Sequence, residues 1–203
     1  QRYAIRSEYM SSRLVNIERT TRETSIKLSL DFDAPQQSID TGLPFLDHIL
    51  TSMAYHGFFG LSIKAKGDLE VDAHHLVEDV GIALGNALSQ TVQQYGHVQR
   101  YGHSIIPMDE ALSEVSVDVS GRPYLVYTAE YPQEYCGEFA TPLIREFLYA
   151  LAHNAKINLH AHCRYGENSH HMAEALFKAL GRAFMTAYQK SDRGEPASTK
   201  GVL

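Results

Sequence analysis

The sequence predicts an α+β domain built from two similar halves packed in layers. Two histidines, two further residues and a glutamate occur together at 74–78 and again at 170–174. The similarity continues beyond this motif, because Leu84-Gly85 recurs as Leu180-Gly181 at the same spacing. In both halves, segments that alternate between polar and apolar residues come ahead of segments with helical periodicity. This order favours a layered α+β domain over a doubly wound parallel one.

The first half runs from about residue 13 to 97. Residues 23–32 alternate as a half-buried strand does. Pro44 opens an apolar segment with helical periodicity that ends near His56 and Gly57. A short strand at 61–65 and a helix that carries the first motif complete this half.

The second half runs from about residue 99 to 188 and repeats the pattern. A strand at 114–119 is followed by a second at 124–127, and a helix then runs from Pro142 to about Asn154. A strand at 156–161 precedes the helix with the second motif. Each half is therefore predicted as strand, strand, helix, strand, helix. The junction at 94–103 is too short for a flexible linker, so a single domain is predicted over 1–203, with a tail at 191–203.

Composition and charge exclude several classes of function. The net charge is −6 and no basic run occurs, which argues against binding to nucleic acid. No apolar stretch approaches the roughly 20 residues needed to span a bilayer, and we expect no signal peptide. Cys136 and Cys163 form no C-x-x-C pair, so free thiols in a reducing cytoplasm are expected. The 11 histidines are the unusual feature of the composition.

The repeated motif suits a divalent metal ion. On a helix, residues three or four apart share a face, so Glu78 and Glu174 each lie beside one histidine of their own motif. An imidazole next to a carboxylate is half of a site for a borderline cation. Adjacent histidines diverge by about 100° on a helix, so each pair is predicted to divide between two metals.

The repeat extends this ligand set, because His48 in the first half occupies the place of Glu146 in the second. Four nitrogen or oxygen ligands for each metal leave open positions on a six-coordinate, Mn²⁺-like ion, where substrate and water can enter. The eight predicted ligands are His48, His74, His75, Glu78, Glu146, His170, His171 and Glu174.

A cation on the helix of the second motif suits a phosphorylated substrate whose other end reaches the metal. Lys178 follows Glu174 by one helical turn, about 5 Å along the axis, so its ammonium group rises from the same face. Arg100, Arg122 and Lys200 are further cations with glycine-containing or turn-forming neighbours.

With these residues identified, nearly the whole chain resembles the imidazoleglycerol-phosphate dehydratase family. The resemblance lies in seven stretches that occur in order: 22–24, 42–50, 67–79, 107–112, 120–123, 166–179 and 198–203. Three positions depart from commoner family residues: Ser52 stands where glutamine is frequent, and Gly60 and Ala73 stand where aspartate is frequent.

The resemblance implies a duplicated fold like the second domain of ribosomal protein S5. It also implies a homo-oligomeric cage of 24 subunits with active sites between subunits, and two Mn²⁺ ions per site bound by the eight ligands above. Glu23 matches the carboxylate that moves a proton, and the 191–203 tail would close on the substrate. The phosphate-binding role carries over to Arg100, Arg122, Lys178, Ser198 and Lys200.

The reaction implied is the removal of water from imidazole glycerol phosphate to give imidazole acetol phosphate, in histidine biosynthesis. Two metals on the imidazole nitrogens would stabilise a substrate imidazolate. Two alternatives use the same metal ligands: a dinuclear metallohydrolase of a phosphorylated substrate, and a non-catalytic protein assembled through metal. The first lacks the His-Glu-x-x-His order and aspartate-rich bridging motifs, and the second needs neither Glu23 nor the Lys178 and Lys200 cations.

Overall fold

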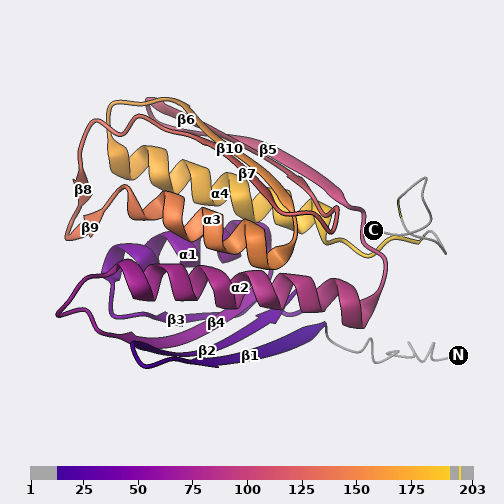
Figure 1. The fold of residues 1–203 in the computed structure, drawn as a ribbon. Coiled ribbons are helices and arrows are strands. Elements are labelled where there is room, and N and C mark those ends of the chain that lie inside the picture. The colour runs from indigo at the N-terminus through magenta and orange to yellow at the C-terminus, as the bar shows by residue number, and fades with distance from the viewer. Residues whose placement is uncertain (1–12, 193–196, 198–203) are drawn as a thin grey trace, which may run out of the picture.

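The computed structural model describes residues 13–192 and residue 197. Two β-sheets form the outer layers and the helices lie between them (Figure 1). Helices α1 and α2 pack on the sheet of the first half, and α3 and α4 pack on the sheet of the second. Across the middle, α1 packs against α4 and α2 against α3, so both halves share one core.

The first half contains a four-stranded sheet of order β1-β2-β4-β3. Strands β1, β2 and β4 pair antiparallel, and β3 adds to β4 in parallel. Proline at the first turn of α1 suits a helix start, because its missing N–H would have no partner there. The elements are β1 (Leu14–Thr20), β2 (Thr24–Asp31), β3 (Gln37–Asp40), α1 (Pro44–Gly57), β4 (Gly60–Gly67) and α2 (His74–Tyr95).

The second half repeats this topology with the order β5-β6-β10-β7, in which only β7 is parallel to its neighbour. A short hairpin, β8 and β9, is inserted before α3 and has no counterpart in the first half. The elements are β5 (Tyr101–Met108), β6 (Ala111–Asp118), β7 (Tyr124–Thr128), β8 (Tyr135–Cys136), β9 (Phe139–Ala140), α3 (Leu143–Ala155), β10 (Asn158–Tyr165) and α4 (Ser169–Ala187).

The α+β class and the two repeated halves are as predicted, but the predicted element order lacks a strand in each half. Each sheet has four strands, so each half is strand, strand, strand, helix, strand, helix, apart from the inserted hairpin. In the second half the strand without a prediction is β5, which contains Pro107. In the first half neither edge strand, β1 nor β3, was located. Edge strands tolerate proline and exposed residues, so their alternation is a weaker signal.

Two equivalent glycines allow the helices of the two halves to approach each other closely. A Cβ added at Gly181 of α4 would lie 2.0 Å from the carbonyl oxygen of Met53 in α1. A Cβ added at Gly85 of α2 would lie 2.7 Å from the carbonyl oxygen of Leu151 in α3. The glycine of the repeated Leu-Gly pair is therefore explained by backbone contact between helices at both places.

Replacing Gly181 with alanine is expected to destabilise the fold by about 1–3 kcal/mol, because the helices must separate to admit the methyl group. Thermal unfolding of the metal-free protein measures this effect. Thr186→Ala, on an exposed position of the same helix, is the matched control and should change little. An equal melting temperature for both variants would contradict the close contact.

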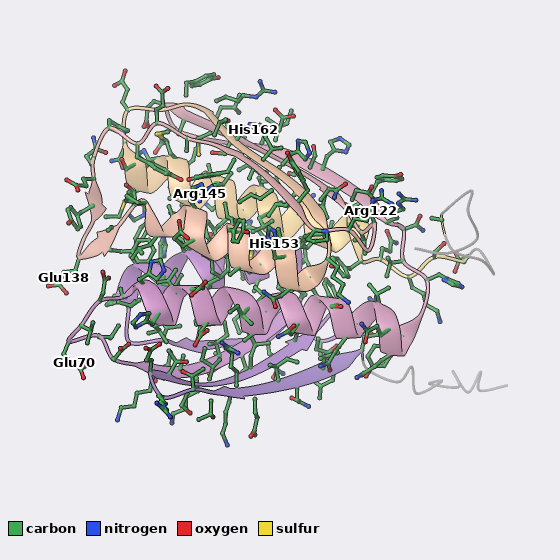
Figure 2. All side chains as sticks on the ribbon, in the orientation of Figure 1. Glu70, Arg122, Glu138, Arg145, His153 and His162 are labelled. Atoms are coloured by element: carbon green, nitrogen blue, oxygen red, sulfur yellow. The ribbon has the colours of Figure 1, made fainter. Side chains whose placement is uncertain are left out.

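The packing brings the starts of all four helices to one end of the molecule. Pro44, Ala73 and Leu143, at the starts of α1, α2 and α3, line one cavity of about 650 Å³. The start of α4 lies beside α1, where the rings of His170 and His48 are 5.1 Å apart. This end carries Glu138 of the hairpin and Glu70 of the β4–α2 loop (Figure 2). Because both motifs open a helix, this end holds the repeated histidines.

Candidate metal and substrate site

Helices α1 and α4 bring two histidines to one carboxylate. His48 Nε2 lies 3.0 Å from Glu174 Oε2, and His170 Nε2 lies 3.2 Å from the same oxygen. His170 and Glu174 meet because they are one turn apart on α4. His48 comes from the second turn of α1, in the other half of the chain. Two imidazole nitrogens and a carboxylate oxygen form a donor group that suits a borderline divalent ion.

The other carboxylate oxygen of Glu174, Oε1, has hydrogen-bond partners different from those of Oε2. Lys178 Nζ donates to Oε1 at 2.9 Å, and Ser52 Oγ donates to it at 3.4 Å. Burial would raise the pKa of Glu174, but hydrogen bonds from Lys178 and His48 lower it to about 2. Glu174 is therefore a carboxylate that presents Oε2 to the histidines. Ser52, one of the departures from the family residues, contributes to this arrangement.

A second donor group lies where the β1–β2 turn meets the start of α2. His75 Nδ1 is 3.1 Å from Asp68 Oδ2 and 3.7 Å from Glu23 Oε2. The hydrogen bond with Asp68 raises the pKa of His75. Glu23 is 54% exposed and, with Arg22, lines an open groove of about 330 Å³. Glu23 is thus accessible to a molecule in the groove and close to a motif histidine.

His171 is held in the same manner as His75, by a carboxylate on Nδ1. Its Nδ1 lies 2.8 Å from Glu110 Oε2, in the turn between β5 and β6. This hydrogen bond lowers the pKa of Glu110 to about 2 and raises the pKa of His171. Sequence reasoning missed Asp68 and Glu110 as site residues, although both lie in stretches that carry the family resemblance.

The two histidines of each motif point in different directions. The rings of His74 and His75 have centroids 6.2 Å apart and planes at 86°, and those of His170 and His171 are 6.2 Å apart at 82°. The members of a pair therefore have different neighbours: His170 contacts Glu174, whereas His171 contacts Glu110. This geometry is compatible with the division of each pair between two metals.

Several predicted ligands do not join a group of donors within the described part of the chain. Among the described residues, two groups place three donors within reach of one ion, and neither includes His74, Glu78, Glu146 or His171. Glu146, the counterpart of His48, instead has its carboxylate 3.4 Å from the guanidinium group of Arg145. A four-ligand site of the predicted kind is thus not assembled from the described part of one chain.

Two predicted phosphate-binding cations lie far from the histidines. Arg100 forms an ion pair with Asp118 at 2.7 Å, which raises the pKa of Arg100, and its Nη1 donates to the Ala197 carbonyl at 2.6 Å. Its backbone N–H donates to the carbonyl of Ala187 at the end of α4. Since a helix rises about 1.5 Å per residue, the segment from Glu174 to Ala187 spans roughly 20 Å.

Arg122 lies in the exposed β6–β7 turn, at the opposite end of the molecule from Glu138 and Glu70 (Figure 2). Lys178, by contrast, is at the histidine end, where it contacts Glu174. Ser198 and Lys200 lie outside the described residues. Within one chain, the donor group on α4 is therefore separated from both arginines.

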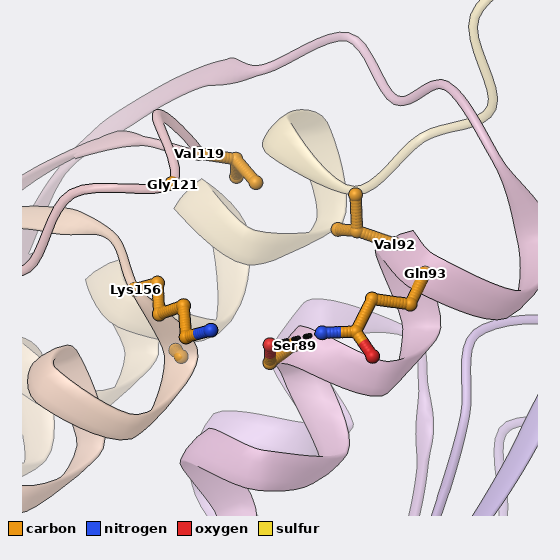
Figure 3. A pocket seen from close by; sticks show the side chains of 7 residues that line it. Ser89, Val92, Gln93, Val119, Gly121 and Lys156 are labelled. Atoms are coloured by element: carbon orange, nitrogen blue, oxygen red, sulfur yellow. Dashed lines mark hydrogen bonds between the residues drawn. The ribbon is translucent and has the colours of Figure 1, made fainter. Parts of the chain in front are cut away.

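A smaller cavity of about 250 Å³ lies between the final turns of α2 and α3 and is lined by Gln93 and Lys156 (Figure 3). Gln93 Nε2 donates to Ser89 Oγ at 3.3 Å across its wall. Neither a histidine nor a carboxylate is among its described lining residues. This cavity is therefore separate from the metal-ligating groups.

In the described part of the chain, no helix combines the length and apolar character needed to cross a membrane.

Known proteins share this sequence and fold over nearly its whole length. The family model for imidazoleglycerol-phosphate dehydratase matches residues 41–184. The imidazoleglycerol-phosphate dehydratase of Acetivibrio thermocellus is 52% identical, over 94% of this chain and 99% of its own length. That of Geobacter metallireducens is 50% identical, over 95% of this chain and 100% of its own length.

Two crystal structures of this family superpose well on the chain. The structure of imidazoleglycerol-phosphate dehydratase from Staphylococcus aureus gives a TM-score of 0.80 at 39% identity and covers 88% of this chain and 99% of its own. The Pyrococcus furiosus structure, in complex with (S)-C348, gives 0.81 at 40% identity and covers 92% and 100%. The chain therefore belongs to the imidazoleglycerol-phosphate dehydratase family, a family of hydro-lyases.

Proposed function

We propose that this enzyme removes water from imidazole glycerol phosphate to give imidazole acetol phosphate, a step of histidine biosynthesis. The observation that carries the proposal is the convergence of His48 and His170 on one oxygen of Glu174, in a chain of this family. Its members are named for this reaction, and the donor group has the chemistry that a metal-dependent version requires.

The donor atoms fit Mn²⁺, two ions per site, held by the eight histidines and glutamates predicted from the sequence. Imidazole nitrogens and carboxylate oxygens without a thiolate favour a borderline or hard divalent ion over a soft one. When bound, the two ions would supply positive charge that stabilises negative charge on the imidazole ring of the substrate.

The side chains of the protein have distinct roles in this proposal. Glu23, half-exposed in its groove, takes the proton from a substrate carbon. Arg100, Arg122 and Lys178, with Ser198 and Lys200 of the tail, hold the phosphate group and thereby fix the position of the reacting carbon. The 191–203 tail closes on the bound substrate.

A site with all these residues requires more than one copy of the chain. The roughly 20 Å along α4 between Glu174 and the residue that contacts Arg100 exceeds the reach of one small substrate. We propose a cytoplasmic homo-oligomer of 24 subunits, in which the histidine end of one subunit meets the arginine end of another. Groups such as Glu146, which lack their predicted partners among the described residues of one chain, would be completed at the same contacts.

The test is turnover of imidazole glycerol phosphate by protein stripped of metal with a chelator, before and after addition of Mn²⁺. We expect no turnover by the stripped protein and restored formation of imidazole acetol phosphate with Mn²⁺. Addition of Mg²⁺ alone is the control, because it prefers oxygen ligands and should restore much less. Fully metallated, assembled protein that leaves the substrate unchanged would contradict the proposed function.

A further inference from the structure

Both halves hold the second histidine of the motif through the same ring atom. His75 Nδ1 lies 3.1 Å from Asp68 Oδ2, and His171 Nδ1 lies 2.8 Å from Glu110 Oε2. An ionised carboxylate only accepts hydrogen bonds, so Nδ1 of each ring must carry the proton. In the neutral ring this leaves the lone pair on Nε2, the form that binds a metal.

We propose that Asp68 and Glu110 are positioning residues for metal binding, each holding a histidine so that its Nε2 is the coordinating atom. This inference rests on the proposed function, because His75 and His171 are ligands only if the enzyme binds its two metals. Carboxylate partners of this kind fix both the tautomer and the orientation of a ligating histidine.

Glu110 occupies the position in the second half that Glu23 occupies in the first. Glu23 directly precedes β2, and Glu110 directly precedes β6, the equivalent strand of the second half. Glu23 Oε2 stays 3.7 Å from its histidine and the side chain is 54% exposed, whereas Glu110 is bonded and 31% exposed. In the first half, Asp68 holds the histidine instead.

The duplicated carboxylate has therefore divided its roles between the halves. Because Asp68, and not Glu23, forms the hydrogen bond with His75, Glu23 remains available for proton transfer. Among the described residues of the second half, the other carboxylate near His171 is that of Asp109, which lies 3.8 Å from Nε2 and not at Nδ1, so Glu110 itself holds the ring. This division explains why a pseudo-symmetric chain would use a proton-transfer residue from one half only.

The second oxygen of Glu110, Oε1, is held by two backbone N–H groups, so the orientation of a glutamine amide at this position can be predicted. Oε1 accepts the backbone N–H groups of Glu167 at 3.0 Å and Asn168 at 2.8 Å. In Glu110→Gln, these two donors hold the amide oxygen at the Oε1 position, so the amide NH₂ faces His171 Nδ1. His171 Nδ1 must then accept a hydrogen bond, its proton moves to Nε2, and the metal-binding lone pair is lost.

The experiment is a Mn²⁺ titration of metal-free protein by calorimetry, for the wild type, Glu110→Gln and a matched control. We expect Glu110→Gln to weaken Mn²⁺ binding by about 10- to 100-fold, the usual effect of losing such a partner. The control is Glu167→Gln, which removes the same charge from an exposed position in the same loop but keeps the backbone donor. It should bind Mn²⁺ like the wild type. Equal affinity for the wild type and Glu110→Gln would overturn the inference.

The corresponding substitution in the first half, Asp68→Asn, is compared with Glu110→Gln for its effect on Mn²⁺ affinity. Asp68 is bonded to His75 through both oxygens, at 3.1 and 3.3 Å, and within the described part of the chain no backbone N–H group donates to either oxygen. The asparagine can therefore turn its oxygen to His75 Nδ1, and we expect a smaller loss than for Glu110→Gln. A larger loss for Asp68→Asn would contradict the orientation argument.

Nuclear magnetic resonance of ¹⁵N-histidine-labelled, metal-free wild type provides a measurement that does not depend on the variant folding. We expect the His171 signals, assigned by their loss in His171→Gln, to report a proton on Nδ1. A proton on Nε2 alone would overturn the inference. Wild-type protein that binds no Mn²⁺ in the titration would contradict the proposed function, whereas Mn²⁺ binding together with a proton on Nε2 of His171 would contradict the role of Glu110 alone.

Discussion

Replacing Glu23 with glutamine is expected to lower kcat by about 10²- to 10⁴-fold, the usual contribution of a positioned proton acceptor. Glutamine has nearly the same shape but cannot take a proton from carbon. Metal content should be unchanged, because Glu23 is not one of the eight proposed ligands and His75 is hydrogen-bonded to Asp68 at 3.1 Å and not to Glu23. The measurement is steady-state turnover of imidazole glycerol phosphate, with metal content determined on the same sample.

Glu70→Gln is the matched control for this prediction. Glu70 lines the same groove and is exposed, so the substitution removes the same charge without touching a motif histidine. It should keep nearly full activity. KM should change little in Glu23→Gln, since the lost interaction belongs to the transition state. Undiminished kcat in Glu23→Gln would show that another group accepts the proton.

Local sequence signals predicted the helices and central strands well. Both motif helices and α1 follow from apolar periodicity and from Pro44, and their ends are set by contacts within a few residues. The two sheets also follow the predicted repeat, because the central strands β2 and β6 alternate strongly. Three of the four edge strands, β1, β3 and β5, were missed because one side of each lacks a partner, so fewer of their positions are constrained by burial. The fourth, β7, was predicted at 124–127, where its residues are apolar or aromatic.

The candidate site was predictable where it depends on helical spacing. His170 and Glu174 lie within 3.2 Å because residues four apart share a helix face. Asp68 and Glu110 could not be found this way, because they come from turns that meet the helix starts only after the sheets have packed. The separation of Arg100 from the donor group on α4 is likewise a property of the fold. Arg100 lies next to the end of α4 only because the chain before β5 packs there, and no spacing in the sequence indicates this position.

Because the arginines lie far from the donor group on α4 within one chain, activity is expected to recover when two inactive variants assemble together. Glu174→Gln removes the carboxylate on which His48 and His170 converge, and Arg122→Ala removes an exposed cation at the opposite end of the molecule. Each variant alone should be nearly inactive, because every site lacks one of the two groups. In a mixed assembly, sites that draw Glu174 from one chain and Arg122 from the other are complete, and about a quarter of wild-type activity is expected for random pairing.

The control mixture pairs Glu174→Gln with Lys178→Ala. Both positions lie on α4, one turn apart and in contact at 2.9 Å, so one chain supplies both to any site. No combination of these chains restores an intact pair, and the mixture should stay as inactive as its parents. The assay uses co-expressed chains with two different affinity tags, purified through both. Activity in the control mixture, or none in the first, would contradict a site shared between subunits. Activity in the first mixture alone would show that one active site takes its metal-ligating Glu174 from one subunit and its phosphate-binding Arg122 from another.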